Sequence, residues 1–90
     1  MSFYTELIDS IPMRTELSTA EIVKYNTGKT KDDFKDWEWN EVKNRTLTAL
    51  NKGITRRDIV KIGYRKLPGE NRQVMIWMRV RAGTRRSFRS

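Results

Sequence analysis

The chain has 90 residues, enough for one small domain with a single hydrophobic core. It contains no cysteine and no histidine, which excludes a disulfide framework and zinc sites built from thiolates or imidazoles. Residues 1–42 carry five Lys and Arg against nine Asp and Glu, whereas residues 43–90 carry 14 against two, so the second half is expected to attract a polyanion.

The same composition argues against several other classes. We expect a cytoplasmic protein, because the first residues lack a basic leader with an apolar stretch and no run approaches the ~18 apolar residues of a membrane span. An enzyme or a cofactor protein is not expected, because His and Cys are absent and no glycine-rich phosphate loop occurs. The carboxylates of residues 32–41 are expected to cap helices and face solvent and not to bind a metal.

Two helices are predicted in the first third of the chain. Within residues 2–11, apolar positions recur at spacings of three and four, which indicates one buried helical face, and Pro12 ends the segment. Residues 13–17 are expected to be a connector. Ser18-Thr19-Ala20-Glu21 matches a capping box, so a short second helix should follow and end at Gly28, which adopts a left-handed exit without steric penalty.

A third helix is predicted over residues 40–52, with Asn40 or Asp36 as its N-cap and Gly53 as its C-terminal stop. Its inward positions are Val42, Thr46, Ala49 and Leu50.

The polar stretch before this helix has two interpretations. It is either a loop beneath which the aromatic residues Phe34, Trp37 and Trp39 pack, or a region where Thr30 and Asp33 cap a helix that begins earlier and runs through. The second interpretation would change which residues form the helix surface.

The hydrophobic period then changes from helix to strand. Alternation over residues 58–65 and 74–81 predicts two strands, and residues 66–72 have the Pro-Gly chemistry of a hairpin loop. Alternation would place Lys61 and Arg65 on one cationic face, opposite an apolar face that docks on the helices. The apolar face would consist of Val60, Ile62 and Tyr64.

Three helices followed by a basic hairpin, in that order, resemble the winged helix-turn-helix superfamily. The resemblance covers about residues 3–81, lies at the level of the fold, and is shared with small phage and bacterial regulators. It implies an α+β fold: a three-helix winged-helix domain over residues 1–81 with a C-terminal β-hairpin wing, followed by a flexible Arg-rich tail over residues 82–90. The chain departs from the pattern between residues 26 and 40, where a tight helix-turn-helix has a turn of about three or four residues.

The resemblance implies that the helix 40–52 enters the major groove and that the hairpin 57–81 is the wing. The outward face of that helix carries Asn44, Thr48 and Asn51, whose amides and hydroxyl can pair with base edges, while hairpin and tail cations would bind phosphate. The full set of candidate nucleic-acid-binding residues is Asn40, Lys43, Asn44, Arg45, Thr48, Asn51, Lys52, Arg56, Arg57, Lys61, Arg65, Lys66, Arg72, Arg79, Arg81, Arg85 and Arg86.

The expected function is sequence-specific binding of duplex DNA by a small transcriptional or phage-type regulator. A homodimer is compatible with this, because one small module covers few base pairs. Two alternatives stay open. One is binding of RNA or single strands, with Trp77, Tyr64 and the basic strands as the surface. The other is a phage-type inhibitor of a host enzyme on a winged-helix scaffold, which would bind its protein partner through the acidic segment 32–41.

Overall fold

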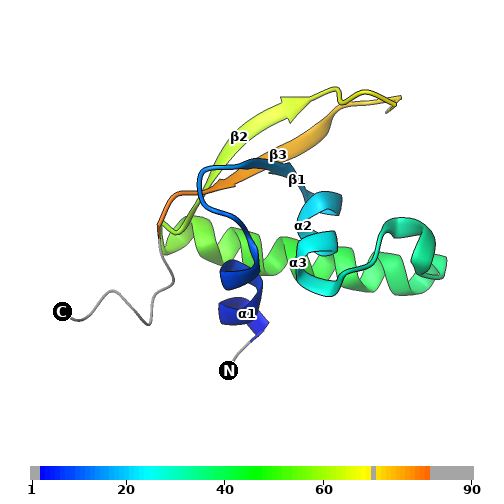
Figure 1. Ribbon diagram of the computed structural model, residues 1–90, viewed down its shortest axis with the longest axis horizontal. Helices are drawn as coiled ribbons and strands as arrows, with labels where there is room; N and C mark the ends of the chain where they lie inside the picture. The colour runs from blue at the N-terminus through cyan, green and yellow to red at the C-terminus, as the bar shows by residue number, and fades with distance from the viewer. Residues whose placement is uncertain (1–2, 70, 82–90) are drawn as a thin grey trace.

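The computed structural model describes residues 3–69 and 71–81 and has an α+β fold (Figure 1), as predicted. The elements, in chain order, are α1 (Phe3–Ser10), β1 (Glu16–Ser18), α2 (Thr19–Thr27), the 3-10 helix η1 (Lys31–Asp33), α3 (Asp36–Thr55), β2 (Ile59–Arg65) and β3 (Val74–Arg79). The strands form an antiparallel sheet in the order β1-β3-β2. None of the helices among the described residues has the length and apolar character needed to cross a membrane.

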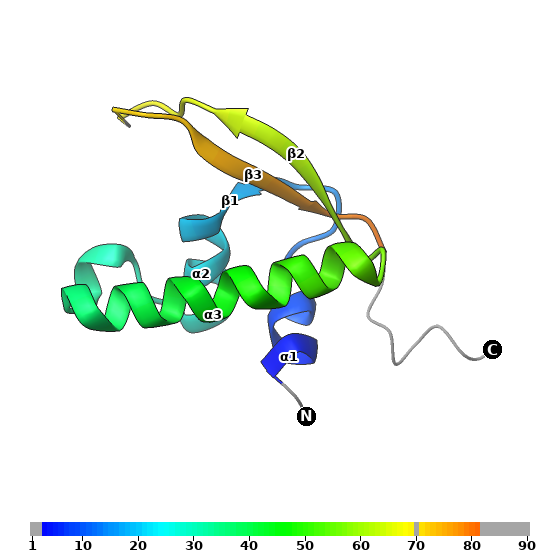
Figure 2. The ribbon, with the colours of Figure 1, turned by 180° about the vertical axis from the view of Figure 1, so that it is seen from behind.

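The long helix α3 is the centre of the molecule. The sheet lies along one side of α3, and α1 and α2 lie against a second side (Figures 1 and 2). The side of α3 that faces the viewer in Figure 2 is covered by no other element. This arrangement leaves one long helical surface open beside the β2–β3 hairpin.

The first two helices match the prediction. Ser18 is the N-cap of α2: its hydroxyl accepts from the Glu21 backbone N–H at 3.2 Å, and the Glu21 carboxylate accepts from the Ser18 N–H at 2.8 Å. At the other end, Gly28 adopts φ 79° and donates its N–H to the Lys24 carbonyl at 2.7 Å. The predicted capping box and glycine exit are therefore confirmed.

The strand β1 was not predicted. Residues 13–17 were expected to be a connector, but Glu16, Leu17 and Ser18 pair with Met78, Trp77 and Ile76 of β3. Three residues are too few to show a strand period, and the strand exists because the edge of β3 is available for pairing.

Both predicted ends of the third helix are wrong. Thr30 and Asp33 cap η1, a separate short helix, and α3 begins at Asp36 with Lys35 as its N-cap. The helix continues past Gly53, which is buried and not a C-terminal stop. A Cβ at residue 53 would lie 2.7 Å from Ile59 Cγ1, so glycine here allows α3 to approach β2 closely.

The two neighbouring tryptophans at the start of α3 differ in environment. Trp39 is buried and its ring lies 5.9 Å from that of Phe34, as expected for a packed aromatic residue. Trp37 is 62% exposed, so its predicted packing is wrong. Two positions along a helix is a rotation of about 200°, which separates the two side chains onto different faces.

The β2–β3 register contains a bulge that overturns the predicted faces of the hairpin. Lys61 pairs with Trp77 but Gly63 pairs with Ile76, so Ile62 is an extra residue, and Gly63 adopts φ 130°. Beyond the bulge the alternation is shifted by one residue. Lys61 and Arg65 therefore lie on opposite faces of the sheet and not together.

The apolar face expected from Val60, Ile62 and Tyr64 is also wrong. Val60 and Tyr64 lie on opposite faces, and they are 37% and 66% exposed. The face that packs on the helices is built mainly by β3 and β1. Its core, together with the helices, includes Leu7, Ile8, Leu17, Ile22, Leu50, Ile59 and Trp77.

Candidate nucleic-acid interface

The open side of α3 presents a row of uncharged polar side chains. At 100° per residue, the exposed uncharged polar residues of one narrow sector of the helix are Asn40, Asn44, Thr48, Asn51 and Thr55. The exposed Trp37 lies in the same sector, at the N-terminal end of α3. Of the predicted inward residues, Thr46, Ala49 and Leu50 are buried and Val42 is half-buried, so the earlier start of α3 does not change the predicted face. The Thr48 hydroxyl donates to the Asn44 carbonyl at 3.0 Å and offers its oxygen outward only as an acceptor.

A first cationic border runs along the α1 side of this row. The guanidinium carbon of Arg45 lies 4.1 Å from the centre of the Phe3 ring. Lys52 Nζ and the Arg56 guanidinium carbon lie 5.2 Å and 4.9 Å from the centre of the Tyr4 ring. All three cations are exposed, so the rings of α1 hold charged groups in place that remain accessible to solvent.

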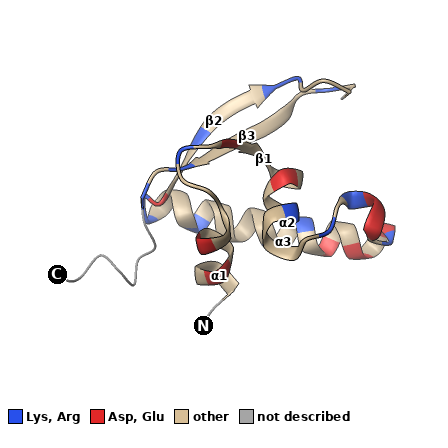
Figure 3. Cartoon of the chain, in the orientation of Figure 1, with Lys and Arg blue, Asp and Glu red and all other residues tan. Residues whose placement is uncertain are grey.

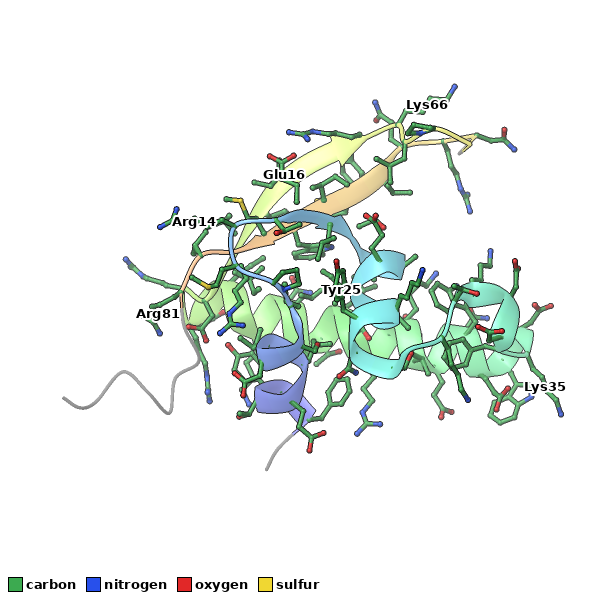
Figure 4. All side chains as sticks on the ribbon, in the orientation of Figure 1. Arg14, Glu16, Tyr25, Lys35, Lys66 and Arg81 are labelled. Atoms are coloured by element: carbon green, nitrogen blue, oxygen red, sulfur yellow. The ribbon has the colours of Figure 1, made fainter. Side chains whose placement is uncertain are left out.

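A second cationic border runs along the opposite flank of the row, at a groove between α3, the start of α2 and the hairpin. Lys31, Lys43 and Arg72 line this groove together with the apolar and aromatic side chains of Leu47, Tyr64, Val74 and Met75. Lys43 and Leu47 are one turn apart on α3 and lie on the flank opposite Arg45. Lys66 is exposed at the far end of the hairpin and points away from α3 (Figure 4).

A linked set of side chains closes the C-terminal end of α3. Asp58 is fully buried; its Oδ2 accepts from the Tyr4 hydroxyl at 2.5 Å and its Oδ1 accepts from Arg81 Nε at 2.9 Å. Arg81 Nη2 also donates to the Arg56 carbonyl at 3.0 Å. Burial, and then the hydrogen bond to Asp58, raise the pKa of the Tyr4 hydroxyl well above its ordinary value of 10.0.

Sequence reasoning missed both Tyr4 and Asp58. The two residues are 54 positions apart, so no local pattern connects them. The one available signal was that Asp58 is one of only two acidic residues in the strongly basic second half. A carboxylate among so many basic residues can form ion pairs that hold several of them in place.

One predicted interface residue is buried instead. Arg79 is 6% exposed, Nη1 donates to the Ile11 carbonyl at 2.9 Å, and Nη2 lies 3.9 Å from Asp9 Oδ1. Its Nε donates to the Arg81 carbonyl at 2.9 Å. Arg79 ties the end of β3 to the loop after α1, because a buried guanidinium must be satisfied by acceptors within the protein.

The two strand cations predicted to act together are separated by the bulge. Arg65 forms an ion pair with Glu16 on the outer face of the sheet. Lys61 Nζ lies 5.6 Å from the centre of the Trp77 ring, on the other face. Both side chains are exposed, so each can contact a ligand, but not as one cationic face.

The tryptophan that the single-strand alternative relied on is inaccessible. Trp77 is 3% exposed, and its indole N–H donates to Thr19 Oγ1 at 3.0 Å. A base cannot stack on a ring buried in this way. Of the aromatic residues proposed for that alternative, Tyr64 is the exposed one.

The N-terminal end of α3 differs in charge from the rest of the interface. Figure 3 shows acidic residues together with some basic ones at this end, while basic residues mark the hairpin and the opposite end of α3. Glu38 and Asp33 accept backbone N–H bonds at the helix starts, as predicted for capping residues. Within residues 3–69 and 71–81, no three acidic side chains are grouped so that they could hold a metal ion.

Three further predicted residues complete the set. Arg57 is exposed in the link between α3 and β2 and has a left-handed backbone conformation, with φ 67°. Arg85 and Arg86, with the rest of the predicted tail, lie outside the described residues.

Comparison of the chain with family models, curated proteins and solved structures found no match.

Proposed function

We propose that this protein binds duplex DNA as a winged helix, with α3 in the major groove and the β2–β3 hairpin against the backbone. The observation that carries the proposal is the uncharged row of α3 between two cationic borders. Asparagine amides pair with adenine edges, and lysine and arginine bind phosphate, so this order of groups fits a groove floor between two phosphate strands.

The dimensions of α3 agree with this use. A helix about 10–12 Å across fits the major groove, which is about 12 Å wide. Its 20 residues span about 30 Å, and the acidic N-terminal end is repelled by phosphate. We therefore place the contact along α3 from Lys43 to its C-cap residue, Arg56.

The arrangement of elements supports the winged-helix part of the proposal. Three helices precede a β-hairpin, and this hairpin lies beside α3, with the basic groove between them. A protein of this kind acts as a small regulator by occupying a DNA site and recruiting or blocking other proteins there.

The first test is fluorescence anisotropy with random duplex DNA, single-stranded DNA and duplex RNA at several salt concentrations. We expect the tightest binding to duplex DNA, with affinity that falls as salt rises because counterions are released from phosphates. Preference for single strands or for duplex RNA would overturn the proposal.

Sequence discrimination tests the role of the α3 row. After selection of a preferred site, Asn44→Ala should lose about 1 to 3 kcal/mol of preference for it, because one base contact is removed. Asn26→Ala in α2, away from the open side of α3, serves as the matched control. Equal losses for the two variants would mean that α3 does not contact the bases.

A second candidate function rests on Trp37. This side chain is 62% exposed and is flanked by Asp36 and Glu38, a combination suited to a basic protein partner, such as a host enzyme that the protein would inhibit. Trp37→Ala should then abolish partner binding and leave duplex affinity unchanged. Under the DNA proposal alone, Trp37→Ala has no effect in either assay.

A further inference from the structure

We infer that Tyr4 and Asp58 position Arg56 and Arg81 as a binding site for one backbone phosphate at the C-terminal end of α3. This inference rests on the proposed function and adds to it the contact that would fix the end of α3 on the duplex. Neither Tyr4 nor Asp58 contacts the DNA itself in this arrangement.

The four residues form a closed ring of contacts. Arg56 lies against the Tyr4 ring, the Tyr4 hydroxyl donates to Asp58, Asp58 accepts from Arg81, and Arg81 donates to the Arg56 carbonyl. The ring joins α1, the C-cap residue of α3, the residue before β2 and the second residue after β3. The C-terminal end of α3, the start of β2 and the end of β3 meet at one end of the molecule (Figure 1). Each arginine is therefore held by groups distant from it in sequence.

The free donors of this ring suit a phosphate. A guanidinium has five N–H donors, and the two contacts described for Arg81 involve its Nε and Nη2. The Arg81 side chain is 47% exposed, so its remaining donors reach solvent (Figure 4). Arginine binds phosphate oxygens in a two-pronged manner, which makes it the better residue where geometry matters.

The local charge also favours an anion. Arg81 pairs with the buried carboxylate of Asp58, and Lys52 and Arg56 lie over the ring of Tyr4, which donates to that carboxylate. Asp58 neutralises one positive charge and keeps the arginines from separating by repulsion. Side chains already held in place lose less conformational entropy on binding, so the site is preorganised for its ligand.

A purely structural role for the ring makes a different prediction from a phosphate site. A structural tie would affect the free energy of unfolding but not the number of phosphates neutralised by the folded protein. That number is given by the slope of log K against log salt concentration, about 0.9 unit for each phosphate on B-DNA. The slope therefore separates the two roles.

The test measures this slope with the full chain and its selected duplex for Arg56→Gln, Arg81→Gln and the double variant. We expect each single variant to lower the magnitude of the slope by about one unit, and the double variant to lower it by no more, because one shared phosphate is lost. Lys24→Gln in α2 is the control of equal charge change. A double variant that loses about two units would overturn the shared site, as would unchanged slopes.

Tyr4→Phe and Asp58→Asn test the positioning roles while both arginines remain. Circular dichroism first establishes that each variant is folded. In the folded variants, the slope of log K against log salt concentration should then shift toward that of the Arg56 and Arg81 double variant. Tyr4→Phe keeps the aromatic side chain and removes only the hydroxyl, so this variant remains informative if Asp58→Asn does not fold. A wild-type slope in folded Tyr4→Phe would remove Tyr4 from the inference.

Failure of the proposed function is distinguished from failure of this inference by a probe without DNA. Inorganic phosphate, compared with chloride at equal ionic strength, should shift the Nε–Hε NMR signals of Arg56 and Arg81 in the wild-type protein. Wild-type protein that does not bind duplex but shows these shifts would overturn the function and leave the phosphate site. Duplex binding without phosphate-specific shifts would overturn the site alone.

Discussion

Gly53 of α3 lies against Ile59 of β2 so closely that a Cβ at residue 53 would be 2.7 Å from Ile59 Cγ1. Alanine is a better helix former than glycine by about 1 kcal/mol, so Gly53→Ala would stabilise an isolated α3. In the folded protein the added methyl must displace buried Ile59, and we expect a net loss of about 1 to 3 kcal/mol in the free energy of unfolding. Urea denaturation measures this change.

Asn51→Ala is the control for the glycine substitution. Asn51 is exposed on the same helix, so alanine there should be neutral or slightly stabilising. If Gly53→Ala were as stable as Asn51→Ala, the close approach of α3 and β2 would be contradicted.

The raised pKa of Tyr4 gives a specific dependence of stability on pH. The unfolded state loses the tyrosine proton near pH 10, whereas the folded state retains it to higher pH, so the unfolded state binds fewer protons in that range. The contribution of protonated Tyr4 to the free energy of unfolding is therefore fully present below pH 10 and declines as the pH rises above 10. Tyr4→Phe should be less stable by about 1 to 2 kcal/mol at neutral pH, because a bond to a charged acceptor is lost.

The difference between wild type and Tyr4→Phe should shrink as pH rises from 9 toward 11.5. Thermal or urea denaturation across this range measures it, with Tyr25→Phe as the control because Tyr25 is 54% exposed. A difference that stays constant with pH would show that the Tyr4 proton is not coupled to folding.

The parts of the fold that sequence analysis predicted correctly depend on short-range chemistry. The α2 capping box lies within four residues, and the exit at Gly28 depends on a single backbone conformation. The outward face of α3 follows from the helical period alone, which is why Asn44, Thr48 and Asn51 are exposed even though both predicted helix ends were wrong. Local pattern is sufficient where the interacting groups are close in sequence.

The errors arise where distant segments meet. Strand β1 forms because β3 offers an edge some 60 residues later, as in the pairing of Leu17 with Trp77. One bulge residue, Ile62, inverts the faces of everything after it in β2, and alternation cannot reveal an insertion. The burial of Arg79 depends on acceptors near residues 9–11, which its own neighbours do not indicate.

The groove between α3 and the hairpin should contribute to affinity without contributing to sequence preference. Lys43 and Arg72 line it from opposite sides, one on α3 and one beside β3. Lys43→Gln and Arg72→Gln should each weaken binding to all duplexes alike and lower the magnitude of the salt slope by about one unit. Anisotropy titrations on preferred and random duplexes measure both effects, with Lys24→Gln as control. A variant that loses affinity for the preferred site alone would reassign that residue to base recognition.

The ion pair of Arg65 with Glu16 offers a substitution that should strengthen DNA binding. The pair joins the two edge strands across β3 on the outer face, and its side chains are 52% and 42% exposed. Because solvent screens such a pair, Glu16→Gln should change the free energy of unfolding by no more than about 0.5 kcal/mol. The same substitution removes the carboxylate that neutralises Arg65, so Arg65 can then bind phosphate, and affinity for every duplex should rise.

Glu6→Gln is the control for Glu16→Gln, because it changes the net charge by the same amount. Glu6 is exposed on α1 and does not lie on the sheet. The increase in affinity should therefore be larger for Glu16→Gln than for Glu6→Gln, and it should disappear when Arg65→Gln is added. Equal increases for the two variants would mean that only total charge matters and that Arg65 stays off the duplex. In that case the hairpin would contact DNA through the groove side alone, where Arg72 lies.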